Sequence, residues 1–68
     1  MKTDERVKAL FALETLARWL AKEAVTQRYR ERGRYRIDPV ELARATNAYL
    51  SENRARLREE ARAILNQV

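Results

Sequence analysis

The chain contains one glycine and one proline in 68 residues, and these two residues, Gly33 and Pro39, lie near its middle. Because both residues interrupt helices, their placement leaves two long arms that nothing breaks. The arms are rich in Ala, Leu, Glu and Arg, which favour helix, and the shortage of turn residues argues against disorder and against a strand-rich fold. We therefore expect an all-α chain that forms a single domain over residues 1–68.

The first arm predicts a helix over about residues 4–32. Thr3 offers a capping hydroxyl, and the acids Asp4 and Glu5 follow it in the first turn, where they face the positive end of the helix dipole. Gly33 supplies the left-handed residue that ends a helix.

The second arm predicts one continuous helix over about residues 39–67. Asp38 is a good N-cap, Pro39 suits the first helical position, and Glu41 follows three residues after the cap. The two helices match in length and a short connection joins them, so we expect an antiparallel helical hairpin.

The first helix is apolar over much of its circumference, which a single neighbouring helix does not cover. A chain of this size has a thin core, and without Cys or His it lacks disulfides and the usual metal ligands that stabilise small domains. We therefore predict a homodimer in which two hairpins form a four-helix bundle. The predicted interface with the second copy, or with another partner, comprises Phe11, Leu16, Trp19, Leu20, Leu50, Asn53, Leu57 and Ile64.

Two polar residues, Thr46 and Asn53, interrupt the apolar stripe of the second helix. If Asn53 is buried, it can select the register and the number of subunits. If it lies at the margin of the stripe, it is exposed to solvent and has no such role. A second architecture also stays open, in which helices over about 39–50 and 53–67 follow a short ribbon at residues 34–37. That arrangement would be similar to the ribbon-helix-helix dimers that place a two-stranded ribbon in the DNA major groove, with Arg34 and Arg36 reading bases.

The side chains argue against catalysis. The chain lacks His and Cys, which are the commonest general base and the best thiol nucleophile. Ser51 is the only serine and has no activating neighbour, and Gly33 stands alone where a phosphate-binding loop needs several glycines. We therefore expect a protein that is not an enzyme, with no cofactor, no metal and no small-molecule substrate.

Arginines alternate through the segment RYRERGRYR, and residues 27–36 carry five Arg and one Glu, a local charge of +4 in a chain of net charge +5. We expect Tyr35 or Ile37 to fold onto the end of the helices and Arg34 and Arg36 to point outward. Arginine and tyrosine together suit phosphate backbones and unstacked bases. The predicted nucleic-acid-binding residues, which would also suit another acidic surface such as an acidic protein, are Arg28, Arg30, Arg32, Arg34, Arg36 and Tyr35.

The competing hypothesis is a protein–protein interaction module, an adaptor, inhibitor or complex subunit. In that case Phe11, Leu16 and Trp19 dock a partner chain instead of a second copy. We expect no membrane span, because the longest apolar run, residues 9–13, is too short to cross a bilayer. The absence of a signal-peptide pattern and of Cys leads us to expect a cytoplasmic protein.

Overall fold

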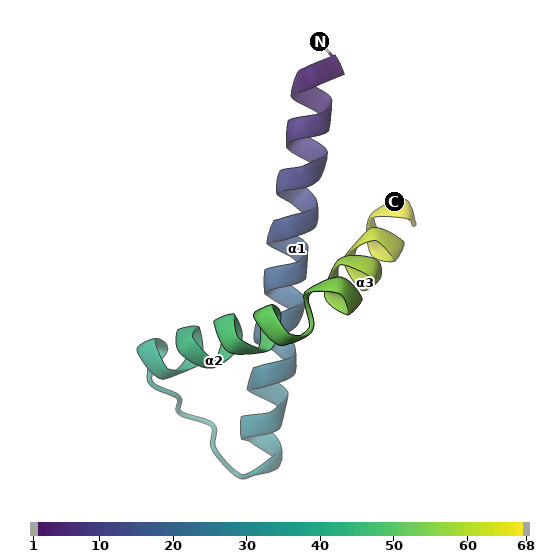
Figure 1. Cartoon of the computed structure of the whole chain (residues 1–68). Helices are drawn as coiled ribbons and strands as arrows, with labels where there is room; N and C mark the ends of the chain where they lie inside the picture. Colours follow the sequence, from purple (N-terminus) through teal and green to yellow (C-terminus); the bar gives the residue numbers. More distant parts are fainter. Residues whose placement is uncertain (1, 68) are drawn as a thin grey trace.

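The computed structural model describes residues 2–67, and the side chains of residues 5–67. This part of the chain forms three helices, α1 (Lys2–Glu31), α2 (Pro39–Glu52) and α3 (Arg54–Asn66), and contains no strand (Figure 1). The prediction of an all-α fold is confirmed. Within residues 2–67, no helix combines the length and the apolarity that a bilayer crossing requires.

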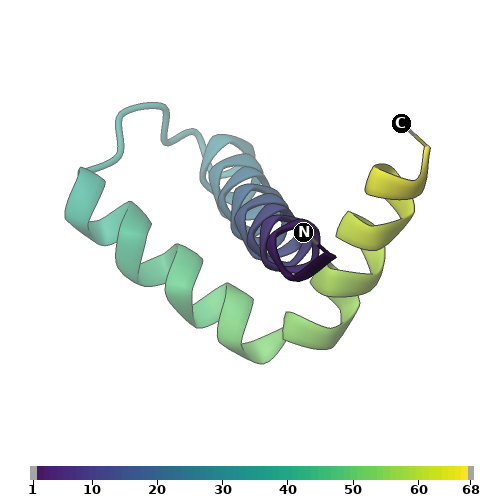
Figure 2. The same ribbon diagram turned by 90° about the horizontal axis from the view of Figure 1, so that it is seen from above.

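The three helices do not form a straight hairpin. α2 crosses α1 at a steep angle, and α3 then turns back towards the end of the molecule that holds the N-terminus (Figure 1). Seen from above, α2 and α3 form an arc around one side of α1 (Figure 2). Each of them packs against α1, whereas they contact each other little.

The second predicted helix is broken at Asn53, so the prediction of one continuous helix over 39–67 is wrong. Asn53 has φ −122° and ψ 21°, outside the helical region, and its side-chain Nδ2 donates to the Tyr49 carbonyl 3.0 Å away. That carbonyl also accepts the Asn53 backbone N–H at 3.0 Å. Asn side chains compete in this way for helical carbonyls, and the bend lets Leu57 turn back onto α1.

The break lies where the ribbon architecture placed it, but the ribbon itself is not present. Residues 34–38 form an irregular connection with no strand. The long α1 also packs against both later helices. The described chain is therefore a hairpin-like arrangement of three helices, in which the second arm is divided into α2 and α3.

The core is a narrow strip between one face of α1 and the two shorter helices. Alanines occupy much of this strip, which lets the helix backbones approach closely, and Leu57 is the largest side chain that is fully buried. Thr46 is also buried, with 6% of its surface exposed. The buried apolar residues are Leu13, Ala17, Ala21, Val25, Leu50, Leu57 and Ala61.

The connection between α1 and α2 has the chemistry that its residues predict. Gly33 has φ +79°, its N–H donates to the Arg30 carbonyl at 2.9 Å, and the Arg34 N–H donates to the Tyr29 carbonyl at 2.8 Å. This pair of bonds is a Schellman motif and ends α1 as predicted. At the start of α2, Asp38 accepts a hydrogen bond from the Val40 N–H at 3.4 Å. The predicted hydroxyl cap of Thr3 lies outside the side chains that the structure describes.

The chain is long and thin, with extents of 47 × 23 × 19 Å. Its radius of gyration is 13.9 Å, against about 11 Å for a compact domain of this length. Its accessible surface is 5714 Å², against about 4,450 Å² for a compact monomer of 8.0 kDa. A single copy thus leaves more surface in water than a protein of this mass normally does.

Candidate interaction surfaces

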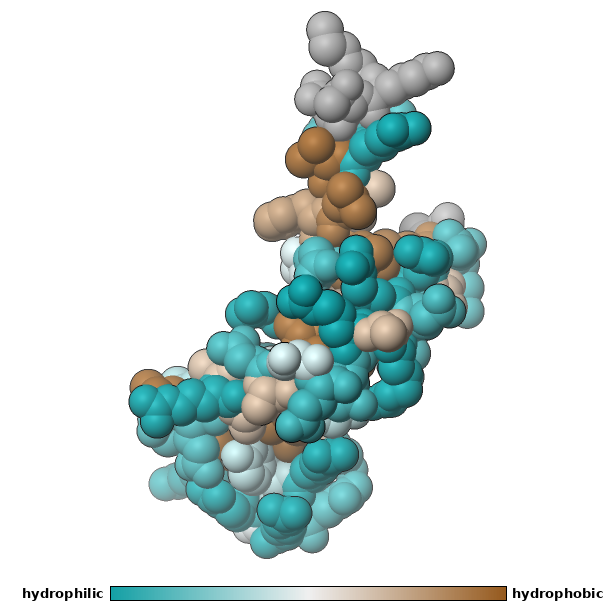
Figure 3. Space-filling model, in the orientation of Figure 1, coloured by the Kyte–Doolittle hydropathy of each residue, from teal (hydrophilic) through white to brown (hydrophobic). Residues whose placement is uncertain are grey.

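The first surface is a shallow apolar groove on the N-terminal half of α1. It has a volume of about 410 Å³ and continues onto the end of α3. Phe11 is 73% exposed and Trp19 is 54% exposed, although both are large apolar side chains. Figure 3 shows apolar residues gathered on this upper part of the molecule. We call this groove the outer face, and its lining residues are Phe11, Ala12, Thr15, Leu16, Trp19 and Leu65.

The outer face exists because α1 carries apolar residues on two sides. Ala17 is fully buried against the other helices, and Trp19 lies two residues later, about 200° around the helix. α2 and α3 therefore cover one side of α1 and leave the other side in water. Val7 and Leu10 are also exposed. Leu10 lies seven residues before Ala17, so it continues the covered side of α1 beside the end of α3 and is not part of the outer face.

The predicted interface residues divide between this surface and the interior. Phe11, Leu16 and Trp19 come together on the outer face. Leu50 and Leu57 are buried in the core of the chain, where no partner reaches them. The remaining three are Leu20, which is half-buried against the core, Asn53, which is half-buried at the bend, and Ile64, which is exposed on α3.

Leu65 belongs to the outer face, although the sequence pattern did not indicate it. It lines the groove beside Leu16 and is 38% exposed. Its neighbour Ile64 continued the apolar stripe of a straight second helix, so the pattern favoured Ile64. The bend at Asn53 changes the direction of α3, and that bend has no strong sequence signal.

The second surface is the arginine segment, residues 28–36. Some of its arginines contact other parts of the chain, and the others stay in solvent. Arg34 donates to both carboxylate oxygens of Glu41, at 3.0 and 3.1 Å, and its guanidinium lies 5.0 Å from the centre of the Tyr29 ring. The hydrogen bond from Arg34 is the main cause that lowers the pKa of Glu41, and the same bond raises the pKa of Arg34. Arg34 therefore folds onto the molecule, contrary to the expectation that it would point outward.

Arg28 is also engaged within the chain. Its guanidinium lies 5.0 Å from the centre of the Tyr49 ring. Arg56 approaches the same ring at 5.8 Å and donates to the Tyr49 hydroxyl at 2.6 Å, the main cause that raises the pKa of Arg56. Tyr49 thus joins the end of α1 to α3 through two cation–π contacts.

The other members of the segment stay in solvent. Arg30, Arg32 and Arg36 are exposed, and within residues 5–67 they form no hydrogen bond or ion pair through their side chains. Tyr35 is 76% exposed, and Ile37 is the residue that folds partly inward. We call Arg30, Arg32, Tyr35 and Arg36 the cationic tip.

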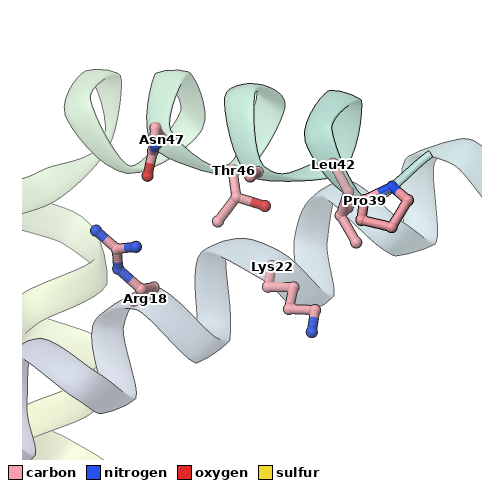
Figure 4. Close-up of a pocket in the computed structure, with 7 residues that line it drawn as sticks. Arg18, Lys22, Pro39, Leu42, Thr46 and Asn47 are labelled. Atoms are coloured by element: carbon pink, nitrogen blue, oxygen red, sulfur yellow. The ribbon is translucent and has the colours of Figure 1, made fainter. Parts of the chain in front are cut away.

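A third feature is a cleft of about 250 Å³ between α1 and the first turns of α2. Figure 4 shows Thr46 pointing from α2 towards α1, between Arg18 and Lys22. The Arg18 guanidinium reaches towards α2 near Asn47, whereas the Lys22 ammonium is turned away from α2. The Oγ1 atom of Thr46 is buried and has no hydrogen-bond partner. We call this the α1–α2 cleft; its lining residues are Arg18, Lys22, Pro39, Leu42, Ala43, Thr46 and Asn47.

In the part of the chain that the structure describes, no group of three or more acidic, His or Cys side chains lies in a position to hold a metal ion. Comparison of the chain with protein families, curated proteins and solved structures found no match.

Proposed function

We propose that the chain is a non-catalytic interaction module that pairs with a second copy of itself through the outer face. The observation that carries this proposal is the exposure of Phe11 and Trp19 on a continuous apolar groove. Contiguous apolar surface of this kind on a small protein marks an interaction site. Aromatic side chains also contribute most of the binding energy at the centre of protein interfaces.

The surface area of the chain supports a partner of substantial size. The difference between 5714 Å² and the roughly 4,450 Å² expected for a compact monomer is about 1,260 Å². A stable protein interface buries about 800 Å² on each partner. The excess is thus sufficient for one complete interface on each copy.

The thin core favours a second copy of the chain as the partner at the outer face. The buried apolar side chains include three alanines and only one large residue that is fully buried, so a single copy has little to stabilise it. Pairing at the outer face adds apolar burial along α1 without disturbing that core. Because the second arm is bent, the resulting dimer has six helices, and its centre is formed by the α1 helices of both copies.

Sedimentation equilibrium tests the pairing. At about 10 µM, an interface worth about 8 kcal/mol gives mostly dimer. We expect Phe11→Glu and Trp19→Glu to give helical monomers, because each places a charge in the apolar groove. Tyr35→Glu is the matched control, since it changes an exposed aromatic residue away from the outer face. A wild-type chain that stays monomeric, or glutamate variants that still dimerise, would contradict the proposal.

A second candidate function, nucleic-acid binding, is favoured by the cationic tip. Arg30, Arg32 and Arg36 form no ion pair within residues 5–67, and Tyr35 offers a ring for stacking. Arg34 is not included, because Glu41 already binds it on both oxygens. We propose that these three arginines contact phosphates.

Salt dependence tests this second candidate. Three phosphate contacts predict that log K falls against log salt with a slope of about −2.7 for duplex DNA. Replacing Arg30, Arg32 and Arg36 by Ser should remove most of that slope. Replacing Arg6, Arg44 and Arg54 by Ser removes the same charge elsewhere on the exposed surface and serves as the control. Equal losses in both triple variants, or no binding by the wild-type chain at low salt, would exclude the tip as the site.

A further inference from the structure

The α1–α2 cleft contains an unusual buried atom. Among residues 5–67, Thr46 Oγ1 is the one buried side-chain nitrogen or oxygen that lacks a hydrogen-bond partner. Such groups are rare in folded proteins, because leaving a buried hydroxyl without a partner costs free energy. Thr46 is 6% exposed and lines the cleft, and its Oγ1 is covered by neighbouring atoms, so a small ligand in the cleft reaches the hydroxyl when those atoms shift.

The side chains around Thr46 are donors. Arg18 and Lys22 lie one turn apart on α1, and Asn47 approaches from α2 (Figure 4). Neither cation forms an ion pair within residues 5–67, and no acidic residue lines the cleft. The cleft therefore combines uncompensated positive charge with hydrogen-bond donors, which is the requirement for binding an anion.

We propose that the α1–α2 cleft binds one small oxyanion, a phosphate or carboxylate group. The Arg18 guanidinium is the anchor, because its planar fork matches two oxygens of such a group. The Asn47 amide and the Thr46 hydroxyl donate from the opposite side. Lys22 completes the site by turning its flexible side chain towards α2.

The rest of the cleft restricts the size and kind of ligand. Pro39, Leu42 and Ala43 form its apolar part, which accommodates a short apolar group attached to the oxyanion. Its volume of about 250 Å³ is below the range of drug-sized ligand pockets. Thr46 and Asn47 belong to α2 and do not line the outer face, whereas Arg18 also lines a pocket with Phe11 and Thr15, so the site adjoins the proposed dimer contact.

Calorimetric titration of the full chain tests the site. The probes are inorganic phosphate and butanoate, each at constant ionic strength maintained with chloride. We expect saturable binding of at least one probe, with one site per chain. Tighter binding of phosphate assigns the site to phosphate groups, and tighter binding of butanoate assigns it to carboxylates with a short apolar chain.

Four variants separate this site from general attraction of anions to a basic protein. We expect Arg18→Gln to weaken binding at least tenfold, and Thr46→Val and Asn47→Ala to weaken it severalfold, because each loses a donor. Arg44→Gln is the control, since it removes the same charge from an exposed position on α2. Sedimentation of each variant checks that the oligomeric state is unchanged. Absence of saturable binding, or equal losses in Arg44→Gln and Arg18→Gln, would overturn the proposal.

Discussion

Replacing Thr46 by Val should stabilise the folded chain when no oxyanion is present. Valine has nearly the shape of threonine, so the substitution exchanges the unpaired Oγ1 for a methyl group in a site that is 6% exposed. The two residues have similar helix propensities, so α2 itself is little affected. The change in the free energy of unfolding therefore comes mainly from the hydroxyl.

The expected gain is about 1–2 kcal/mol, because mutational data give about 1–3 kcal/mol for a buried polar group without a partner. A domain of this length is stable by only about 3–10 kcal/mol in total, so the change is large in proportion. It corresponds to a rise in Tm of about 4–8 °C for each kcal/mol.

Thermal unfolding followed by circular dichroism measures this change, in a buffer with chloride as its only anion. All variants are compared at one protein concentration, because pairing of two copies makes Tm depend on concentration. Thr26→Val, at a half-buried position on α1, is the matched control and should change Tm little. A lower Tm for Thr46→Val than for the wild-type chain would refute the reasoning, since it would mean that the hydroxyl has a partner.

Two further predictions concern the connection between α1 and α2. Because Arg34 lowers the pKa of Glu41, their contact stabilises the fold above the ordinary Glu pKa of about 4.3, and this stabilisation is lost as the pH falls through the lowered value. In Glu41→Gln, the free energy of unfolding should therefore fall less steeply as the pH decreases, as measured by urea unfolding between pH 2 and 6. An unchanged pH dependence would contradict the role of the contact. Gly33→Ala meets no atom within 4 Å but must adopt φ +79°, so it should cost about 1 kcal/mol from backbone strain alone. Equal urea midpoints for the wild-type chain and Gly33→Ala would contradict that explanation, and Gly33→Asn should cost less because Asn tolerates this conformation.

Local chemistry explains which features of the candidate surfaces could be predicted from the sequence. Tyr35 and Arg36 lie in a connection where few other side chains can reach them, so the sequence alone indicated a basic, solvent-exposed tip. Arg34 has the same neighbours in the sequence, yet it folds onto Glu41, seven residues later and in the first turn of α2. The pairing of Arg34 with Glu41 depends on the direction in which α2 starts after the connection. The alternating arginines of the sequence do not indicate that direction.

The sequence by itself determined the helical class and the ends of the helices that surround the connection. Gly33, Asp38 and Pro39 act through their own backbone and their nearest neighbours, so their effects do not depend on the rest of the chain. The tertiary structure alone decided between a continuous and a broken second helix, which the sequence left open, and it divided α1 into a covered side and an outer face. These features depend on which helices meet, and contacts between residues far apart in the chain select among arrangements that the local pattern permits equally.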